Sequence, residues 1–383
     1  MTERGAQPLM KDILGPAALM VIADAGVAAS PDFDRAAFEG AAEPGLAALS
    51  VMERVRHIAD ALNVALPGDY ARAVAILCAM APRLTHAFQA FALAEYVARH
   101  GLHDVARSMG ALAELTRYGS AEFAIRPFLA REPDRILAQM LEWTRHPDPH
   151  VRRLASEGAR PRLPWATQIA ALKADPTLAA PILEALKADP SLYVRKSVAN
   201  HLNDIGKDRP DWLVARVSDW SMADPHTAWI VRHALRSLVK KGDPAALAIL
   251  GARTDAAVTV KGFAITPAGI RLGEAIAITV EIGSEAETTQ RLVVDYRVHY
   301  ARPHGRAAAK VFKWKTFDLE AGSTQRLATR QVIRDFSTRR HHPGRHAVDL
   351  LVNGRVMASA AFDLLAPDPF TSSTRRARTG SGR

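Results

Sequence analysis

The segment 148–165, DPHVRRLASEGARPRLPW, gathers charged and aromatic residues that could form a functional site. It sets one carboxylate, Glu157, among four arginines and ends in an aromatic residue, Trp165. The arginines are Arg152, Arg153, Arg160 and Arg162. Guanidinium groups bind phosphates and carboxylates, and Pro161 and Pro164 restrict the backbone that carries two of these arginines. The alternative interpretation is an amphipathic helix whose charged face lies in water.

A short helix is predicted to carry the first part of this segment. Asp148 is a favourable N-cap, and Pro149 suits the first helical position. Val151 and Leu154 then lie on one apolar stripe. Gly158 is expected to end the helix, so that the second pair of arginines and Trp165 lie in the turn and loop that follow.

This helix belongs to a repeat. Asp-Pro dipeptides precede Val151, Val194 and Val231, and the intervals between these valines are 43 and 37 residues. HEAT and armadillo repeats span roughly 40–47 residues. The pattern therefore predicts an all-α, HEAT-like solenoid.

Polar residues recur at equivalent repeat positions. Arg152 and Arg195 each follow a repeat valine directly, and Glu157 and Asn200 each come six residues after one. Equivalent positions line one surface of a solenoid, so these arginines are candidate phosphate contacts. The alternative is that they cap neighbouring turns or pair with acids of the next repeat.

The segment 193–207, YVRKSVANHLNDIGK, is a second polar helix. Asn200 and Asn203 are three residues apart, so they share a face and can donate hydrogen bonds to a phosphate. His201 has no partner at a metal-ligand spacing, so no metal site is expected. Asp204 adds another carboxylate next to them.

A further carboxylate lies upstream, in SAEFAIRPFL at 120–129. Ser120 is expected to N-cap a helix, which would place Glu122 in its first turn. A carboxylate there is favoured by the helix dipole. That stabilising role is the alternative to a catalytic one.

Composition excludes some protein classes. A single cysteine, Cys78, rules out an internal disulfide and a cysteine-built zinc site. The apolar run 13–23 contains Gly15 and Pro16 and is too short to span a bilayer. We expect a cytoplasmic protein without a membrane segment.

The C-terminal third differs in both charge and pattern. Residues 257–383 contain 4 Lys and 16 Arg against 11 acidic residues, which is +9 of the net charge of +10. Alternating apolar residues and an Asn353-Gly354 hairpin turn predict about seven short strands, an immunoglobulin-like β-sandwich. The excess charge suggests that this module binds a polyanion, with nucleic acid as the first candidate.

These patterns predict an all-α domain followed by an all-β domain, with boundaries at 1–255 and 256–366. A basic tail over 367–383 is expected to be disordered. Within the β-domain, the segment 334–346, RDFSTRRHHPGRH, suits a phosphate backbone. Its candidate DNA contacts are Arg339, Arg340 and Arg345. An exposed loop without a ligand is the alternative.

Three segments resemble a known family. SAEFAIRPFL at 120–129, VRRLASEGARPRLPWA at 151–166 and YVRKSVANHLNDIGK at 193–207 resemble the AlkC branch of the AlkC/AlkD-type DNA alkylation repair glycosylases. The resemblance runs over most of residues 8–255. The C-terminal domain is similar to the immunoglobulin-like module carried by some members of that branch.

The resemblance implies a HEAT-like glycosylase that removes alkylated bases from double-stranded DNA during base excision repair. N3-methyladenine is the foremost substrate, and N3-methylcytosine is a second candidate. The family acts without a metal or other cofactor and without extruding the damaged base. A base methylated on a ring nitrogen is already cationic, so it departs without a general acid. The remaining task is to stabilise an oxocarbenium-like sugar and to position a water, which carboxylates can do.

Carried onto this sequence, the resemblance makes Glu122 and Glu157 the acidic pair, with Asp204 a third carboxylate and Trp165 the aromatic partner of the cation. It makes Arg152, Arg160 and Arg162 phosphate or structural partners. The segments around Glu122 and Glu157 contain no lysine, so we expect a monofunctional hydrolase without lyase activity.

Two other hypotheses are compatible with the sequence. One is a non-catalytic solenoid that binds DNA or a protein, because repeat proteins mostly present binding surfaces. The other makes the β-sandwich a protein-interaction module whose charge is incidental. A monomer is expected in each case, since DNA would occupy the most polar surface.

Overall fold

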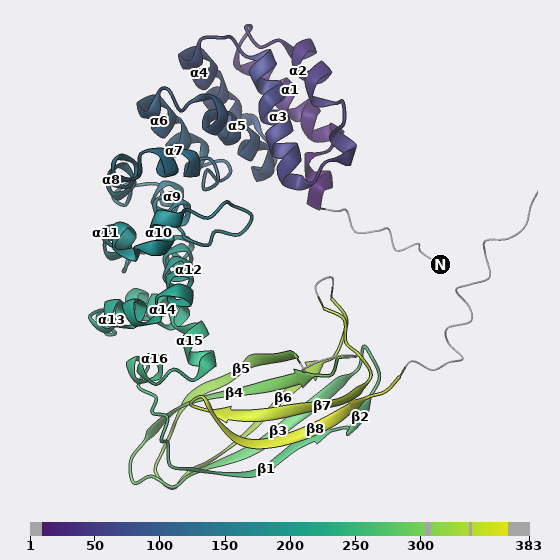
Figure 1. Cartoon of the computed structure of the whole chain (residues 1–383), viewed down its shortest axis with the longest axis vertical. Helices are drawn as coiled ribbons and strands as arrows, with labels where there is room; N and C mark the ends of the chain where they lie inside the picture. The colour runs from purple at the N-terminus through teal and green to yellow at the C-terminus, as the bar shows by residue number, and fades with distance from the viewer. Residues whose placement is uncertain (1–9, 303–307, 337–338, 367–383) are drawn as a thin grey trace, which may run out of the picture. The chain divides into compact units, whose positions relative to one another are not determined.

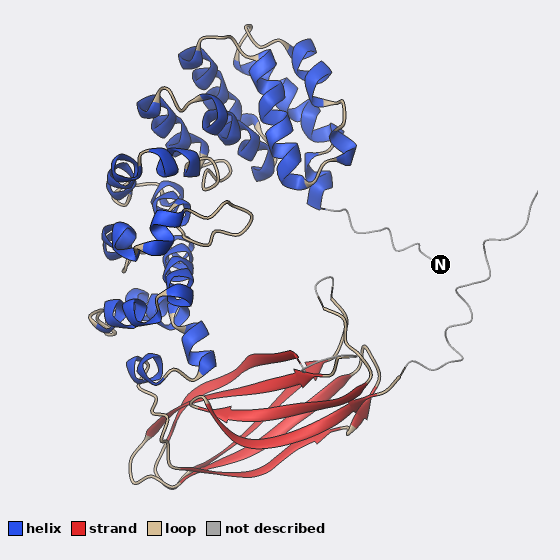
Figure 2. Ribbon diagram, viewed as in Figure 1, coloured by secondary structure: helices blue, strands red, loops and turns tan. Residues whose placement is uncertain are grey.

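The computed structural model describes residues 10–302, 308–336 and 339–366. The chain forms two compact units, one ending at Ala234 and one beginning at Leu235 (Figure 1). Helices make up the first unit, and strands dominate the second (Figure 2). The prediction of an α region followed by a β region is confirmed.

Short helices form the first unit, and several of them begin at an aspartate cap. Their bounds are η1 (Met10–Leu14), α1 (Pro16–Ala29), α2 (Arg35–Ala42), η2 (Leu46–Ala48), α3 (Val51–Ala65), α4 (Tyr70–Met80), η3 (Ala81–Arg83), α5 (Ala87–His100), α6 (Val105–Leu115), α7 (Arg126–Arg131), α8 (Pro133–Trp143), α9 (Pro149–Gly158), α10 (Ala170–Ala174), η4 (Pro176–Ala179), α11 (Ala180–Ala185), α12 (Leu192–Asp208), α13 (Pro210–Ser218) and α14 (Pro225–Ala234). Asp34, Asp69 and Asp104 each accept a hydrogen bond from the backbone N–H three residues on. Such a cap stabilises a helix by about 1 kcal/mol.

The helix α9 forms as the sequence predicts. The side chain of Asp148 accepts from the backbone N–H of His150 at 2.8 Å, and Pro149 is the first helical residue. The helix ends at Gly158. A Cβ at that position would lie 2.6 Å from Ile125, so glycine also allows the close approach of the segment before α7.

The repeat seen in the sequence corresponds to packed helices. Val151 of α9, Val194 of α12 and Val231 of α14 are fully buried. The long helix α12 packs against both α9 and α14. The three helices are therefore consecutive layers of one solenoid core.

The first helical segment meets the length and composition of a membrane span. It covers Met10–Ala29 with a mean hydropathy of 1.6, and so extends beyond the run 13–23 seen in the sequence. In the structure, Leu14, Leu19 and Ile22 of this segment are buried in the helical core. A buried core helix passes the same test, so the segment is weak evidence for a membrane span.

The second unit begins with two helices, α15 (Arg236–Lys241) and α16 (Pro244–Ile249). Its strands are β1 (Val258–Thr266), β2 (Gly269–Ile270), β3 (Ala275–Ser284), β4 (Gln290–Tyr300), β5 (Ala308–Leu319), β6 (Thr324–Val332), β7 (Gly344–Val352) and β8 (Arg355–Leu364). The predicted boundary at 255/256 lies between the end of α16 at Ile249 and the start of β1 at Val258. By contacts, however, α15 and α16 group with the strands, so the compact unit starts earlier.

The strands form two sheets with the orders β1-β3-β6 and β2-β8-β7-β4-β5. All pairings are antiparallel except β2 with β8. Ile276 and Ile278 of β3 pack with Tyr296 and Val298 of β4, so both sheets contribute to one core. This two-sheet core is the sandwich that the alternating pattern predicts.

The turn between β7 and β8 confirms the hairpin prediction. Asn353 has φ 46° and Gly354 has φ 81°, both in the left-handed region that a type I′ turn requires. The Asn353 side chain is buried, donating to the Arg253 carbonyl at 2.7 Å and accepting from the Val293 N–H at 2.7 Å. The predicted tail over 367–383 lies outside the described residues.

Candidate active site

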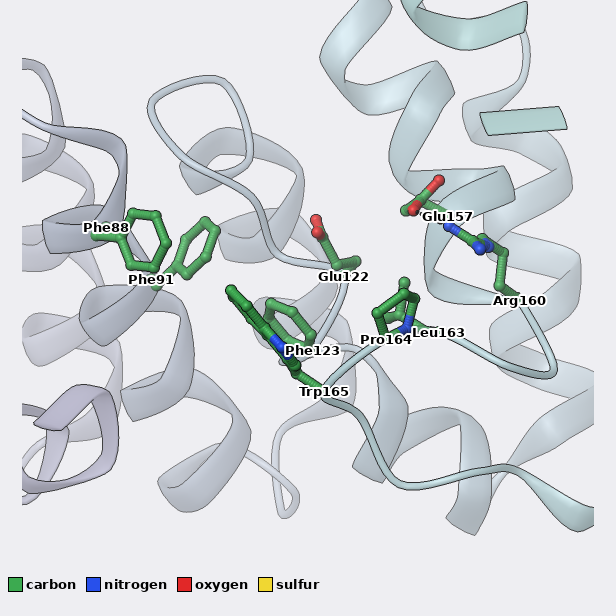
Figure 3. A pocket seen from close by; sticks show the side chains of 9 residues that line it. All are labelled: Phe88, Phe91, Glu122, Phe123, Glu157, Arg160, Leu163, Pro164 and Trp165. Atoms are coloured by element: carbon green, nitrogen blue, oxygen red, sulfur yellow. Dashed lines mark hydrogen bonds and ion pairs between the residues drawn. The ribbon is translucent and has the colours of Figure 1, made fainter. Parts of the chain in front are cut away.

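Both predicted acidic residues line one pocket of the helical unit, about 240 Å³ in volume (Figure 3). The lining comes from α5, from the turn before α7, and from the end of α9 with the loop that follows it. The lining residues are Phe88, Phe91, Glu122, Phe123, Glu157, Arg160, Leu163, Pro164 and Trp165. Two of these regions belong to segments that the sequence analysis selected, 120–129 and 148–165. The third, α5, was not selected.

Aromatic rings form much of the pocket wall. Phe88 and Phe91, three residues apart on α5, have ring centroids 4.9 Å apart. Phe91 lies 5.8 Å from Phe123, in an edge-to-face arrangement. Trp165 is 60% exposed and has φ 67°, a left-handed conformation that is uncommon for a bulky residue. Its ring therefore belongs to the open side of the pocket.

The two carboxylates are buried and share one arginine. Glu122 is 7% exposed and Glu157 is 5% exposed. Arg153 of α9 lies 3.1 Å from Oε2 of Glu122 through Nη1 and 3.5 Å from Oε1 of Glu157 through Nη2. Its guanidinium also lies 4.8 Å from the ring centroid of Tyr193. Arg153 thus connects the acidic pair.

Glu157 is the more extensively bonded of the pair. Its Oε1 accepts from Nη1 of Arg160 at 2.6 Å, and its Oε2 accepts from Oγ of Ser197 at 2.6 Å. Arg160 continues the network to Asp204 through Nε at 2.9 Å. Lys207 donates to the other oxygen of Asp204 at 2.8 Å. Asp204 is therefore a buried neutralising partner of Arg160, and it does not line the pocket.

Burial and the neighbouring charges together set the pKa shifts at this site. It raises the pKa of Glu122, and the attraction of Arg153 only partly opposes that rise. Burial would lower the pKa of Arg153, but the charges of Glu122 and Glu157 outweigh it, so the arginine pKa is raised. Arg153 is therefore cationic, and Glu122 is the carboxylate whose proton affinity is increased.

The expected helix around Glu122 does not form. Residues 122–125 make a turn, and α7 begins only at Arg126. Ser120 does not cap a helix; its Oγ accepts from Nη1 of Arg153 at 3.0 Å. In this turn, the Glu122 side chain contacts Arg153 and lines the pocket. The helix-dipole explanation for this acid is therefore wrong.

Arg152 and Arg195 make the same structural contacts. Nη1 of Arg152 donates to the carbonyls of His146 and Pro147, at 2.9 and 2.8 Å. Nη1 of Arg195 donates to the corresponding carbonyls one repeat later, at 2.8 and 2.7 Å. Arg152 also pairs with Asp189, the N-terminal acid of the next repeat. These contacts match the capping alternative, and a DNA-contact role for either arginine stays a prediction.

The other predicted DNA-contact residues of this unit have protein partners as well. Arg162 pairs with Asp208 through two hydrogen bonds, of 2.7 and 2.5 Å. Asn203 is buried and donates to the carbonyl of Ala234 at 2.7 Å. Asn200 is half-buried. Of these residues, Asn203 is the least accessible to a phosphate.

The predicted arginines of the second unit lie on the segment between β6 and β7 and at the start of β7. Arg339 packs over the ring of Tyr300, 4.9 Å from its centroid, and forms a backbone bridge with Phe336. Arg340 and Arg345 are exposed. A role in DNA binding stays a prediction for all three.

His201 contacts the backbone next to Glu157. Its Nδ1 is 3.0 Å from the carbonyl oxygen of Ser156, and burial lowers its pKa to about 4. The imidazole is therefore neutral at physiological pH. In the described part of the chain, no group of three or more His, Cys, Asp or Glu residues is arranged to hold a metal ion.

Sequence reasoning missed part of this site. Arg153 carries a readable signal, because it is four residues before Glu157 on one helix face. Phe123 follows Glu122 directly. Phe88 and Phe91 carry no signal in the sequence, because only the packing of α5 beside the turn before α7 brings them to the pocket.

Comparisons with known proteins agree with this architecture. Residues 116–238 match the family described as DNA alkylation repair enzyme, and residues 259–366 match the C-terminal immunoglobulin-like domain of the uncharacterised protein YhaZ. The YhaZ protein of Bacillus subtilis is 39% identical over 316 residues, which cover 82% of this chain and 88% of YhaZ.

A solved structure is similar over nearly the whole chain. It is the Pseudomonas fluorescens alkylpurine DNA glycosylase AlkC bound to DNA containing an abasic site analogue, with 49% sequence identity and a TM-score of 0.90. The match covers 94% of this chain and 100% of that one. The chain therefore belongs to the AlkC branch of the DNA alkylation repair proteins, in the form that carries a C-terminal immunoglobulin-like domain.

Proposed function

We propose that this protein is a monofunctional DNA glycosylase that hydrolyses the N-glycosidic bond of cationic alkylated bases in double-stranded DNA. N3-methyladenine is the main substrate, and N3-methylcytosine is a second one. The observation that carries the proposal is the pocket in which two buried carboxylates face a wall of aromatic rings. Anionic and aromatic groups both attract a positive charge, and both are present here.

The substrate supplies part of the catalysis itself. A base alkylated on a ring nitrogen carries a positive charge and leaves as a neutral molecule when its bond to C1′ breaks. The positive charge then moves to the sugar, which becomes oxocarbenium-like. Carboxylates fixed in a site of low dielectric stabilise that charge without reorganising. No general acid is needed for departure.

The bonding of the two carboxylates suggests different roles. Both oxygens of Glu157 accept hydrogen bonds, from Arg160 and Ser197, so this carboxylate is rigid. It suits electrostatic stabilisation of the sugar cation. Glu122, with its raised pKa, is the better proton acceptor. In the proposed reaction, Glu122 orients a water and takes its proton while the water oxygen bonds to C1′.

The aromatic wall suits a lesion that is met at the surface of the duplex. Trp165 is 60% exposed at the open side of the pocket, where its ring can meet the sugar or the cationic base from outside. A labile, charged lesion does not require the enclosing pocket that base-flipping enzymes use. We therefore propose that the base is not extruded.

The remaining features of the proposal follow from the same chemistry. None of the pocket-lining residues is a lysine, so no amine is positioned there for a Schiff base and lyase step. Departure of a cationic base needs no Lewis acid, so the reaction is proposed to proceed without a metal. The net charge of +10 favours association with DNA. The protein is proposed to act as a monomer in the cytoplasm.

Base release from methylated DNA tests the proposal. Purified protein is incubated with methylated genomic DNA and a chelator, and the free bases are separated and quantified. Glu157→Gln is assayed in parallel, with Glu142→Gln as the matched control, because Glu142 forms an exposed ion pair with Arg145 on the helical unit. We expect wild type and the control to release N3-methyladenine and Glu157→Gln to release little.

Other outcomes separate the parts of the proposal. Release that stops with the chelator contradicts the metal-free reaction. DNA binding without release by any variant favours the non-catalytic scaffold. Equal release by Glu157→Gln and wild type removes Glu157 from the mechanism. Strand cleavage at the abasic product contradicts the monofunctional assignment.

A further inference from the structure

Arg126, the first residue of α7, is buried but does not line the pocket. Its side chain is 5% exposed, and burial lowers its pKa to about 10. Its hydrogen bonds within the described part of the chain all go to backbone carbonyls of one segment. Nη1 donates to Gly158 at 2.9 Å and to Arg160 at 3.0 Å, whereas Nε and Nη2 both donate to Thr167, at 3.1 and 2.8 Å.

The segment that Arg126 contacts is the one that completes the pocket. Between Gly158 and Thr167 the chain has no helix or strand, and it carries Arg160, Leu163, Pro164 and Trp165. One guanidinium thus bonds to both ends of this loop. We call residues 159–167 the Trp165 loop.

The contacts of Arg126 are unusual in energetic terms. A buried charge is normally paired with an opposite charge, because desolvation is costly. Among the described residues, Arg126 forms no ion pair, and the nearby Arg160 charge lowers its pKa further. Carbonyl dipoles alone hold this cation. Its charge-assisted hydrogen bonds therefore stabilise the position of the loop.

The position of Arg126 relates the loop to the acidic residue upstream. The turn 122–125, which carries Glu122 and Phe123, leads directly into Arg126. Trp165 lies in the loop and holds an uncommon backbone conformation with φ 67°. A strained conformation persists only where the surrounding structure fixes it. Arg126 supplies hydrogen bonds on both sides of that residue.

We propose that Arg126 is a positioning residue for the glycosylase reaction: it fixes the Trp165 loop against the Glu122 turn and thereby sets the Trp165 ring relative to the acidic pair. The inference rests on the proposed function. Arg126 acts only through the loop and contacts neither substrate nor the reacting atoms.

A double-mutant cycle tests whether Arg126 acts through Trp165. Single-turnover excision rates at saturating enzyme are measured for Arg126→Gln, Trp165→Ala and the double variant. We expect Arg126→Gln to lower the rate by up to about tenfold in the wild-type background, because displacing the Trp165 ring can cost no more than the roughly tenfold loss expected when the ring is removed. In the Trp165→Ala background, the same change is expected to have less than about a twofold effect, because the ring it positions is absent.

Arg54 provides the matched control. It is also buried, at 4% exposure, and among the described residues its hydrogen bonds go to the backbone carbonyls of Lys11, Leu14, Ala47 and Leu49. These carbonyls lie far along the chain from the pocket segments. Arg54→Gln is expected to lower stability without changing the excision rate of the folded protein. If Arg54→Gln lowers the rate as much as Arg126→Gln does, the positioning role is contradicted.

Limited trypsin digestion tests the loop without using activity. The bond after Arg162 lies within the loop, and the bond after Arg160 is resistant because Pro161 follows it. We expect Arg126→Gln to speed cleavage at Arg162 and Arg54→Gln to leave it unchanged. If wild type excises no base, the proposed function fails, but this digestion still tests the contact.

The two experiments together have one supporting outcome and two contradicting ones. Faster cleavage together with a rate effect that disappears in the Trp165→Ala background supports the inference. Unchanged cleavage, or an equal loss of rate in both backgrounds, overturns it. If Arg126→Gln does not fold, Arg126→Lys replaces it in both experiments, because lysine keeps the charge but cannot reach all of the carbonyls at once.

Discussion

The charged residues that are candidates for function are placed differently in the two units of this protein. In the helical unit, Glu122, Arg153 and Glu157 are largely buried and paired with one another. In the β unit, Arg340 and Arg345 are exposed. Buried, paired charges create a preorganised field that acts on one bound group. Exposed charges act on any polyanion that approaches, and salt screens them.

This difference suggests a division of labour. Under the proposed function, the helical unit carries out the chemistry on one cationic lesion, and the β unit is predicted to hold the phosphate backbone. Changes in the buried network should therefore alter the rate, with little dependence on salt. Changes at the exposed arginines should alter DNA affinity, with a clear dependence on salt.

The largest expected effect is that of Glu122→Gln. We expect the single-turnover rate to fall about 10²–10³-fold at neutral pH, because the variant loses both the proton acceptor and one buried charge. Burial raises the Glu122 pKa, and the carboxylate works only when ionised. Wild-type activity should therefore fall as pH drops through a value above the usual glutamate pKa. The variant should lack this acid limb.

The pH profile also provides the control for Glu122. Glu142→Gln, at an exposed ion pair, should keep the wild-type rate and acid limb. A wild-type profile that stays flat from neutral pH down to the usual glutamate pKa would show that Glu122 is not the proton acceptor. The water would then be oriented by another group, with Glu157 as the next candidate.

Sequence reasoning reached the local parts of this site and missed the non-local ones. Asp148, Gly158 and the Asn353-Gly354 turn follow rules that involve only neighbouring residues, and all were predictable. The placement of Glu122 was wrong in detail, since Ser120 bonds to Arg153 across the fold instead of capping a helix. A local capping preference of about 1 kcal/mol was outweighed by a tertiary contact.

The aromatic wall shows the same limit. Phe88 and Phe91 look like ordinary core residues of an amphipathic helix in the sequence. Their role at the pocket depends on the packing of α5, and the spacing of residues in the sequence does not predict that packing. The capping contacts of Arg152 and Arg195 could be predicted as one of two alternatives, because the repeat puts them in register.

A buried acid in the β unit sharpens the comparison between the two units. Asp295 of β4 is 5% exposed, and within the described residues its Oδ1 has no hydrogen-bond partner. Burial raises its pKa to about 6, partly offset by the charges of Lys240 and Lys313. Unlike Glu122 and Glu157, this carboxylate has no paired arginine in the described structure, so its ionised form should destabilise the unit.

The sign of that effect gives a stability prediction. Between the unfolded pKa of 3.8 and the folded pKa of about 6, the folded state binds more protons, so stability should fall as pH rises through this window. Asp295→Asn is expected to stabilise the β unit by about 1–2 kcal/mol at pH ~7 and by little at pH ~4. Hydrogen exchange of the β4 amides measures this directly. Asp318→Asn, at an exposed pair with Arg291, should show no such gain, and an equal gain in both variants would contradict the burial argument.

Trp165 tests the aromatic part of the helical site. Trp165→Ala should lower excision of N3-methyladenine about tenfold, because a cation–π contact contributes roughly 1–2 kcal/mol. Trp165→Phe keeps a ring of weaker attraction and should lose less. Single-turnover rates on one defined lesion measure both. Trp229→Ala is a control at another indole, which stacks on His233 away from the pocket-lining set. Equal rates for Trp165→Ala and wild type would leave the ring without a role in catalysis.

The smallest expected effect lies in the exposed arginines of the β unit. Replacing Arg340 and Arg345 with glutamine should weaken DNA binding a few-fold at low salt and lower the salt slope of log K by up to about 0.9 for each lost phosphate contact. Arg339→Gln should change the slope less, because its guanidinium packs over Tyr300. Arg145→Gln removes another exposed charge, from the helical unit, and serves as the control. The excision rate at saturating enzyme should stay at the wild-type value, because none of these side chains lines the pocket. An unchanged slope in the Arg340 and Arg345 variants would instead favour a β unit that binds protein, and would leave recognition of DNA to the helical unit alone.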